Sequence, residues 1–224
     1  MNSPWFLLIF ITCSVGFTAE LKILAVPPAR RLVWNNDLSV IRSFLKSQAH
    51  ALFQKSLADT QRRTLGHVMA VITCDNVTRW TSISINPARS ISPLLRDGVT
   101  GLFNPSPHAY MQSESEIKGF IETNQSVARE LVLNISNQSC LELIAFDNFH
   151  RSSNLLFFGP LIAPLTEYEK ARHGISAQVG GTGASYAVAL LKMADFKLPF
   201  DAYKENFGNY SFYTAQGIVD HIYP

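Results

Sequence analysis

The pattern that most constrains the fold is a pair of alternating segments joined by a short turn. Between residues 65 and 74 the side chains alternate between two faces, as they do along a strand, and both faces are largely apolar. Asp75 and Asn76 follow with the chemistry of a turn, and residues 79–85 alternate again. The two segments therefore predict an antiparallel hairpin that begins near His67.

The segments around this hairpin carry both helical and extended patterns. The spacing of apolar side chains predicts helices over residues 38–53, 114–122, 140–151 and 184–196, and strands over residues 21–26 and 128–135. Residues 86–109 have the composition of an ordered loop, and the aromatic residues 210–223 are predicted to close a sheet. We expect one α+β domain over residues 20–224, with a helix-rich part over 20–64 and a core over 65–224 in which a central antiparallel sheet packs against helices.

The composition is that of a globular domain. Hydrophobic residues make up 47% of the 224 and include 15 Phe, which is enough apolar surface to bury a core and excludes a disordered chain. The 19 Lys and Arg residues barely exceed the 17 Asp and Glu residues, so no nucleic-acid partner is expected. The sequence has neither metal-ligand spacing nor a dinucleotide fingerprint, and we predict no metal and no cofactor.

Residues 1–19 have the pattern of a secretory signal peptide. An apolar run from Phe6 to Cys13 precedes small residues and is too short to span a bilayer. We expect this segment to be removed and the remaining chain to be exported, to a periplasm or the extracellular space, without being integral to a membrane. In an oxidising compartment, Cys74 and Cys140 form either one disulfide or two separate buried thiols.

Other short motifs are interpreted as surface features. Asp147 and His150, three apart on a predicted helix, are typical of a solvated pair, and Asp220 with His221 is interpreted as a surface pair on a strand. Five Asn-x-Ser/Thr tripeptides matter only in a eukaryotic secretory pathway, and they begin at Asn76, Asn124, Asn134, Asn137 and Asn209.

Two places carry residue types suited to chemistry. The first is Gly66-His67-Val68 at the start of the predicted hairpin, where an imidazole is available as a base. The second is the glycine-rich turn over residues 180–185 that opens the last predicted helix, where backbone N–H groups can face an anion. The turn lacks the lysine of a phosphate-binding loop, so close packing explains its glycines better than a nucleotide does.

Taken in order, Gly66-His67-Val68, the loop segment Leu95–Phe103 and the helix opening Thr182–Val188 resemble the circularly permuted papain-like proteins of the NlpC/P60 and lecithin-retinol-acyltransferase types. The resemblance covers about residues 65–196 and implies a papain-like α+β fold. In that family a His on the first core strand is the base, which corresponds to His67, and a Cys at the start of the later helix is the nucleophile. A helix N-terminus and a nearby imidazole both lower a thiol pKa.

The chain departs from the family where the nucleophile is expected, because that position is Gly183. Thr81 or Ser82 occupies the region of the group that orients the imidazole. Three explanations remain open: a non-catalytic relative, a nucleophilic Ser185 acting with His67 in place of its expected role as a helix cap, or a Cys-to-Gly change at position 183.

These observations lead to a hypothesis about function. We expect an exported protein on a papain-like scaffold, a degenerate or non-catalytic relative of cysteine amidases and acyltransferases that acts on or binds cell-wall peptides or acyl lipids. Whether it is an enzyme is left open. If it is active, the reaction is amide or ester hydrolysis or acyl transfer, with the helix start at residues 182–185 stabilising the oxyanion. The alternative is a secreted interaction module that binds a protein partner and has no catalytic cleft.

Overall fold

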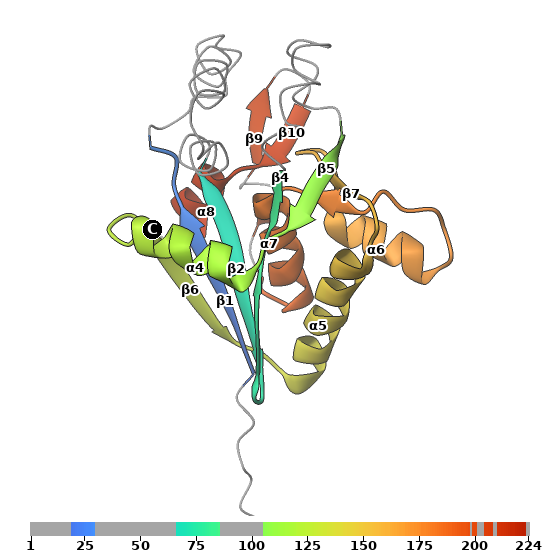
Figure 1. Cartoon of the computed structure of the whole chain (residues 1–224), viewed down its shortest axis with the longest axis horizontal. Helices are drawn as coiled ribbons and strands as arrows, with labels where there is room; N and C mark the ends of the chain where they lie inside the picture. The colour runs from blue at the N-terminus through green and yellow to red at the C-terminus, as the bar shows by residue number, and fades with distance from the viewer. Residues whose placement is uncertain are drawn as a thin grey trace, which may run out of the picture.

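The computed structural model describes residues 19–29, 66–85, 105–197, 199–200, 204–207 and 210–222. Within these ranges the chain has a mixed α+β structure in which helices cover antiparallel sheets, as expected (Figure 1). Three predictions lie wholly or mainly outside the described residues: the signal peptide except Ala19, the helix over residues 38–53, and residues 86–104 of the loop.

The first sheet has the strand order β3-β2-β1-β6, and every neighbouring pair is antiparallel. Its strands are β1 (Ala19–Val26), β2 (His67–Cys74), β3 (Val77–Thr81) and β6 (Arg129–Asn134). The predicted hairpin is confirmed as far as Thr81, and Asp75, with a φ of 53°, makes its turn. Residues 83–85, expected in its second strand, pair with residues 109–111 instead. The strands expected over residues 21–26 and 128–135 are confirmed as β1 and β6.

Both faces of this sheet are covered, which explains the two apolar faces of β1 and β2. Leu21 and Ile23 face the main core, to which α5 (Asn137–Ser152), α7 (Gly183–Met193) and α8 (Ala215–Ile222) contribute. On the opposite face, Leu24 and Met69 pack with Phe120 of α4 (Glu114–Thr123). Figure 1 shows α4 crossing the near face of β1 and β2. A strand buried on both faces is apolar throughout.

The second sheet has the order β4-β5-β7-β8, and only its last pair is parallel. Its strands are β4 (Ile83–Ile85), β5 (Ser106–Met111), β7 (Leu156–Phe158) and β8 (Gly180–Gly181). Only Ser82 separates β3 from β4, so one extended segment contributes to both sheets. The predicted loop is wrong over residues 106–109, which belong to β5, because a composition rich in Pro and Ser hides a strand whose partners are distant in sequence.

The helices over residues 114–122, 140–151 and 184–196 are confirmed as α4, α5 and α7, although α7 ends at Met193. Ser113 and Glu116 form the capping box that starts α4. Every residue of α7 from Gly183 to Leu191 is buried, so this helix is enclosed on all sides. The structure also contains α6 (Pro164–Arg172), which the sequence patterns did not predict.

The C-terminal prediction is correct only in its first part. The hairpin of β9 (Lys204–Phe207) and β10 (Tyr210–Tyr213) is a separate two-stranded sheet, and α8 follows it. Thr214 starts α8 by accepting a hydrogen bond from the Gly217 N–H at 2.9 Å, and Ile218 and Ile222 are buried four residues apart. Asp220 and His221 are therefore on a helix and not, as predicted, on a strand.

A disulfide joins Cys74, at the end of β2, to Cys140 in the first turn of α5, with their Cα atoms 5.9 Å apart. The bridge decides between the two alternatives that the sequence left open. A disulfide is compatible with an exported protein. In the part of the chain that the structure describes, none of the helices has the length and apolar character needed to cross a membrane.

Candidate functional site

The site begins at His67, the first residue of β2, whose entry into the strand is fixed by Gly66. Gly66 has a φ of 74°, in the left-handed region that favours glycine, and a Cβ there would lie 2.7 Å from the Ala215 Cβ and 2.8 Å from the Val26 carbonyl oxygen. The His67 imidazole is 8% exposed and meets the Phe120 ring edge-on, with the ring centroids 5.6 Å apart. The imidazole is thus held at the end of the first sheet.

Gly183, the first residue of α7, lies directly against this imidazole. A Cβ built on Gly183 would be 3.2 Å from His67 Cε1, 3.0 Å from Ser82 Oγ and 2.6 Å from the Val68 carbonyl oxygen. The structure therefore brings together the two positions that the sequence singled out. The structure also places the backbone carbonyl of Val68 so close to Gly183 that it would crowd any side chain at this position.

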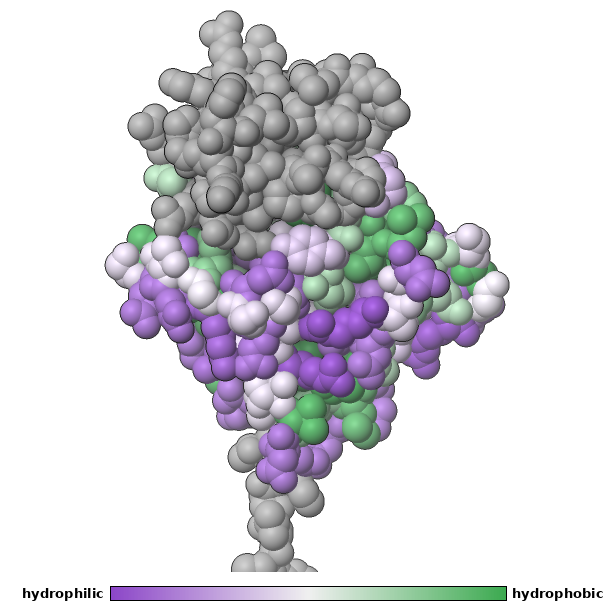
Figure 2. Space-filling view, viewed as in Figure 1, coloured by the Kyte–Doolittle hydropathy of each residue, from purple (hydrophilic) through white to green (hydrophobic). Residues whose placement is uncertain are grey.

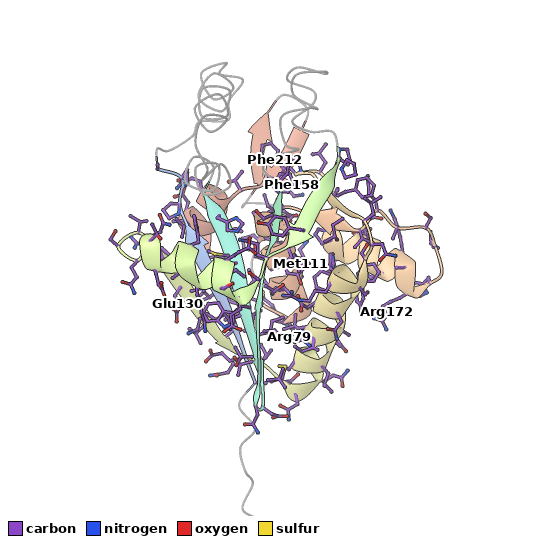
Figure 3. The ribbon with its side chains drawn as sticks, viewed as in Figure 1. Arg79, Met111, Glu130, Phe158, Arg172 and Phe212 are labelled. Atoms are coloured by element: carbon purple, nitrogen blue, oxygen red, sulfur yellow. A yellow bond between two sulfur atoms is a disulfide. The ribbon has the colours of Figure 1, made fainter. Side chains whose placement is uncertain are left out.

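Gln112, which the sequence patterns did not single out, is a hydrogen-bonding partner of the imidazole. Its side-chain Oε1 lies 2.5 Å from His67 Nε2, and its backbone N–H donates to the Ser82 carbonyl at 2.9 Å. Because an amide oxygen only accepts, Nε2 is the donor in this contact. Gln112 directly follows Met111, which Figure 3 shows at the end of β5. The amide therefore orients the imidazole.

Ser82 completes the group from the junction between the two sheets. Its hydroxyl donates to the Val68 carbonyl at 2.7 Å and lies 3.3 Å from His67 Nε2. Ser82 and Gln112 are both fully buried, and Gln112 Nε2 has no hydrogen-bond partner among the described residues. Of the two candidates for the orienting group, Ser82 is the one beside His67.

Ser185, the other hydroxyl considered as a nucleophile, lies in the capping box of α7. Its Oγ accepts from the Thr182 N–H at 2.8 Å, and its own N–H donates to Thr182 Oγ1 at 3.1 Å. Ser185 is two residues beyond Gly183, which is about 200° around a helix, so the two Cβ directions are nearly opposite. The hydrogen bonds of Ser185 thus belong to the start of the helix.

Thr81, the remaining candidate, belongs to a buried polar network. Its hydroxyl donates to Asp147 Oδ1 at 2.5 Å, and the Tyr186 hydroxyl donates to the same oxygen at 3.0 Å. Arg151 Nε donates to Asp147 Oδ2 at 2.7 Å, and Arg151 Nη2 donates to the Trp80 carbonyl at 2.8 Å. Burial is the main reason that the Tyr186 pKa lies well above its usual value, and the negative charge of Asp147 raises it further. The phenol therefore keeps its proton and remains a donor.

The interpretation of Asp147 and His150 as a solvated pair is wrong, because both are fully buried. Asp147 is paired with Arg151, and His150 Nδ1 donates to the Phe146 carbonyl at 3.0 Å. His150 Nε2 has no hydrogen-bond partner within the described ranges. Helical spacing correctly put the two residues on one face, but it does not tell whether another element covers that face.

His150 should make the stability of the fold depend on pH. Burial lowers its pKa to about 4, against 6.5 when unfolded, so between these values the unfolded chain binds more protons and stability falls as the pH falls. We expect this group alone to lower the free energy of unfolding by about 1.4 kcal/mol per pH unit in that window. The measurement is the free energy of unfolding in urea, determined from pH 7 to pH 4 for the native chain and for a His150→Gln variant. Parallel curves for the two proteins would contradict the assignment.

No protein-family model, curated protein or solved structure matches this chain. The chemistry of the site must therefore be argued from its own groups. These are an imidazole oriented by an amide, a buried hydroxyl, and the N-terminus of an 11-residue helix, placed together by elements from four separate parts of the chain. A base oriented in this way suits acyl chemistry, but residue 183 carries no nucleophile.

Proposed function

We propose that this chain is an exported papain-like scaffold that binds a cell-wall peptide or an acyl lipid without cleaving it. The observation that carries the proposal is the pair of His67 and Gly183. An oriented imidazole lies against the first residue of a buried helix, which is the relation that a cysteine nucleophile and its base require. In this chain the residue at the helix start has no side chain.

The close packing around Gly183 supports binding over turnover. A Cβ on residue 183 would approach the Val68 carbonyl oxygen to 2.6 Å, and that oxygen is held by the Ser82 hydroxyl. Strand β2 and helix α7 are therefore adapted to glycine. The proposal favours a non-catalytic relative over a hydrolase based on Ser185, whose hydroxyl is engaged in the helix cap.

The central test introduces the missing thiol and removes the hydroxyl that crowds it. We expect G183C to lower the free energy of unfolding by about 1–3 kcal/mol, as overpacking does, and the double variant G183C/S82A to recover part of this loss. In the double variant, alkylation of the introduced thiol should proceed well below the ordinary thiol pKa of about 8.5, because His67 and the helix N-terminus favour the thiolate. Both variants carry Cys13→Ser, so that no other unpaired thiol reacts.

One result would contradict this geometry, and another would contradict the proposed function. Adding His67→Ala to the double variant should move the alkylation profile toward that of an ordinary thiol, and an unchanged profile means that His67 does not face residue 183. Hydrolysis of a peptide or acyl ester by the native chain, lost in both His67→Ala and Ser185→Ala, would establish the active hydrolase in place of the binding protein.

Binding itself is tested by calorimetry with a soluble muropeptide and a short acyl ester. The expected result is saturable binding of one of them by the native chain, without release of product. We expect His67→Ala to weaken it about tenfold, the effect of losing one good hydrogen bond. Gln138→Ala, an exposed change at the far end of α5, is the matched control. Failure of both ligands to bind would favour a protein partner.

A further inference from the structure

Five of the thirteen asparagines in the chain begin an Asn-x-Ser/Thr tripeptide. Ser and Thr together make up about 15% of the residues, so about two such tripeptides are expected by chance. Asn209 lies outside the described residues. Asn124 closes α4, where its Nδ2 donates to the Phe120 carbonyl at 2.7 Å. The remaining three have no such place in a cap.

Asn76, Asn134 and Asn137 are all exposed and converge at one end of the molecule, which we call the disulfide pole. Asn76 follows Cys74 by two residues and Asn137 precedes Cys140 by three, and the disulfide joins these two cysteines. Asn134 pairs with Glu20 in the sheet, next to the pairing of Ala19 with Cys74. Figure 1 shows the β2–β3 turn and the start of α5 side by side at the lower end of the view.

The same pole exposes apolar side chains, which a polar group attached nearby would shield from water. Val77, inside the first tripeptide, is 51% exposed, and Leu141 is 65% exposed. Leu141 lies four residues after Asn137 and therefore on the same face of α5. Figure 2 shows hydrophobic surface among polar residues at this lower end. The pole is also roughly 23 Å from His67, the length of β2, so a large group there lies far from the candidate site.

We propose that the disulfide pole carries N-linked glycans, attached at Asn76 and at Asn134 or Asn137, which cover Val77 and Leu141. The inference rests on the proposed export, and it requires that this export run through a eukaryotic secretory pathway. In the reaction, the asparagine amide nitrogen attacks the anomeric carbon of an oligosaccharide held on a lipid pyrophosphate. A nitrogen–carbon bond replaces the sugar–phosphate bond, the lipid pyrophosphate leaves, and the amide proton passes to a base of the transferase.

The test is secretion of the full chain by cultured eukaryotic cells, followed by peptide mapping after enzymatic removal of N-linked glycans in heavy-oxygen water. Each occupied asparagine becomes a labelled aspartate. The expected result is label at Asn76 and at one or both of Asn134 and Asn137 in the secreted protein. Secreted protein without label at these positions overturns this inference and leaves the export proposal intact, whereas a chain retained in the cytosol overturns both.

The covering role has a separate readout. A variant with Asn76, Asn134 and Asn137 all changed to Gln should associate, and light scattering should show a larger mean mass than that of the glycosylated chain at equal concentration. Adding Val77→Thr and Leu141→Gln should return it to the monomer mass. A glycan-free variant that is as monomeric as the glycosylated chain would contradict the covering role.

Discussion

Replacement of Asp147 by Ala should lower the free energy of unfolding by about 3–5 kcal/mol, as the loss of one partner from a buried ion pair does. The Asp147 carboxylate is fully buried and accepts from Thr81, Tyr186 and Arg151, so it joins β3, α5 and α7. Its removal leaves the phenol and the hydroxyl without their acceptor in the core. Equilibrium unfolding in urea measures the change.

Asp147→Asn is the matched control, because it keeps the shape and one acceptor oxygen but removes the charge that pairs with Arg151. Its loss should be smaller than that of Asp147→Ala. Since Thr81 directly precedes Ser82, the alanine variant should also disturb the surroundings of His67. A loss below about 1 kcal/mol in Asp147→Ala would falsify the assignment of this carboxylate as the centre of the network.

Removal of the disulfide should have an effect of similar size. Cys74 and Cys140 are separated by 66 residues, and the chain-entropy account of such a loop gives roughly 4 kcal/mol in favour of the bridged chain. We therefore expect the double variant Cys74→Ala/Cys140→Ala to unfold at a much lower urea concentration than the native chain. The measurement is the free energy of unfolding for both proteins without reductant.

The control for this prediction is the response to a thiol reductant. The native chain should lose stability when reductant is added and approach the double variant, whereas the double variant should not respond. If the two proteins have the same stability in the absence of reductant, the bridge does not stabilise the chain that the cells produce.

Local patterns predicted the elements whose partners are near in sequence or whose faces are regular. The β2–β3 hairpin is an example, since the alternation and the Asp75-Asn76 turn lie within one short segment. Helix α7 is another, because its apolar residues follow directly on a glycine-rich turn. By contrast, β5 pairs with β4 and β7, and its register with β7 contains an irregularity, so its own residues carry little sign of a strand.

The candidate site was predictable in part for a similar reason. His67 and Gly183 stood out because each occupies the start of a recognisable element. Gln112 did not, because its relation to His67 depends on a backbone hydrogen bond to Ser82 across thirty residues. Its one local signal is its position, directly after β5 and directly before the Ser113 cap of α4. The disulfide likewise depends on a distance in space, which cysteine spacing does not give.

The strand order of the first sheet has a consequence for how the chain folds. Strand β1 lies in the middle of the sheet although it precedes both of its neighbours in sequence, and Ala25 pairs with Val68 on one side and with Arg129 on the other. During synthesis, the second edge of this apolar strand stays unpaired until β6 has been made, more than a hundred residues after β1. Contacts of such long range slow folding, so the apolar residues of β1 remain open to aggregation until β6 has been made.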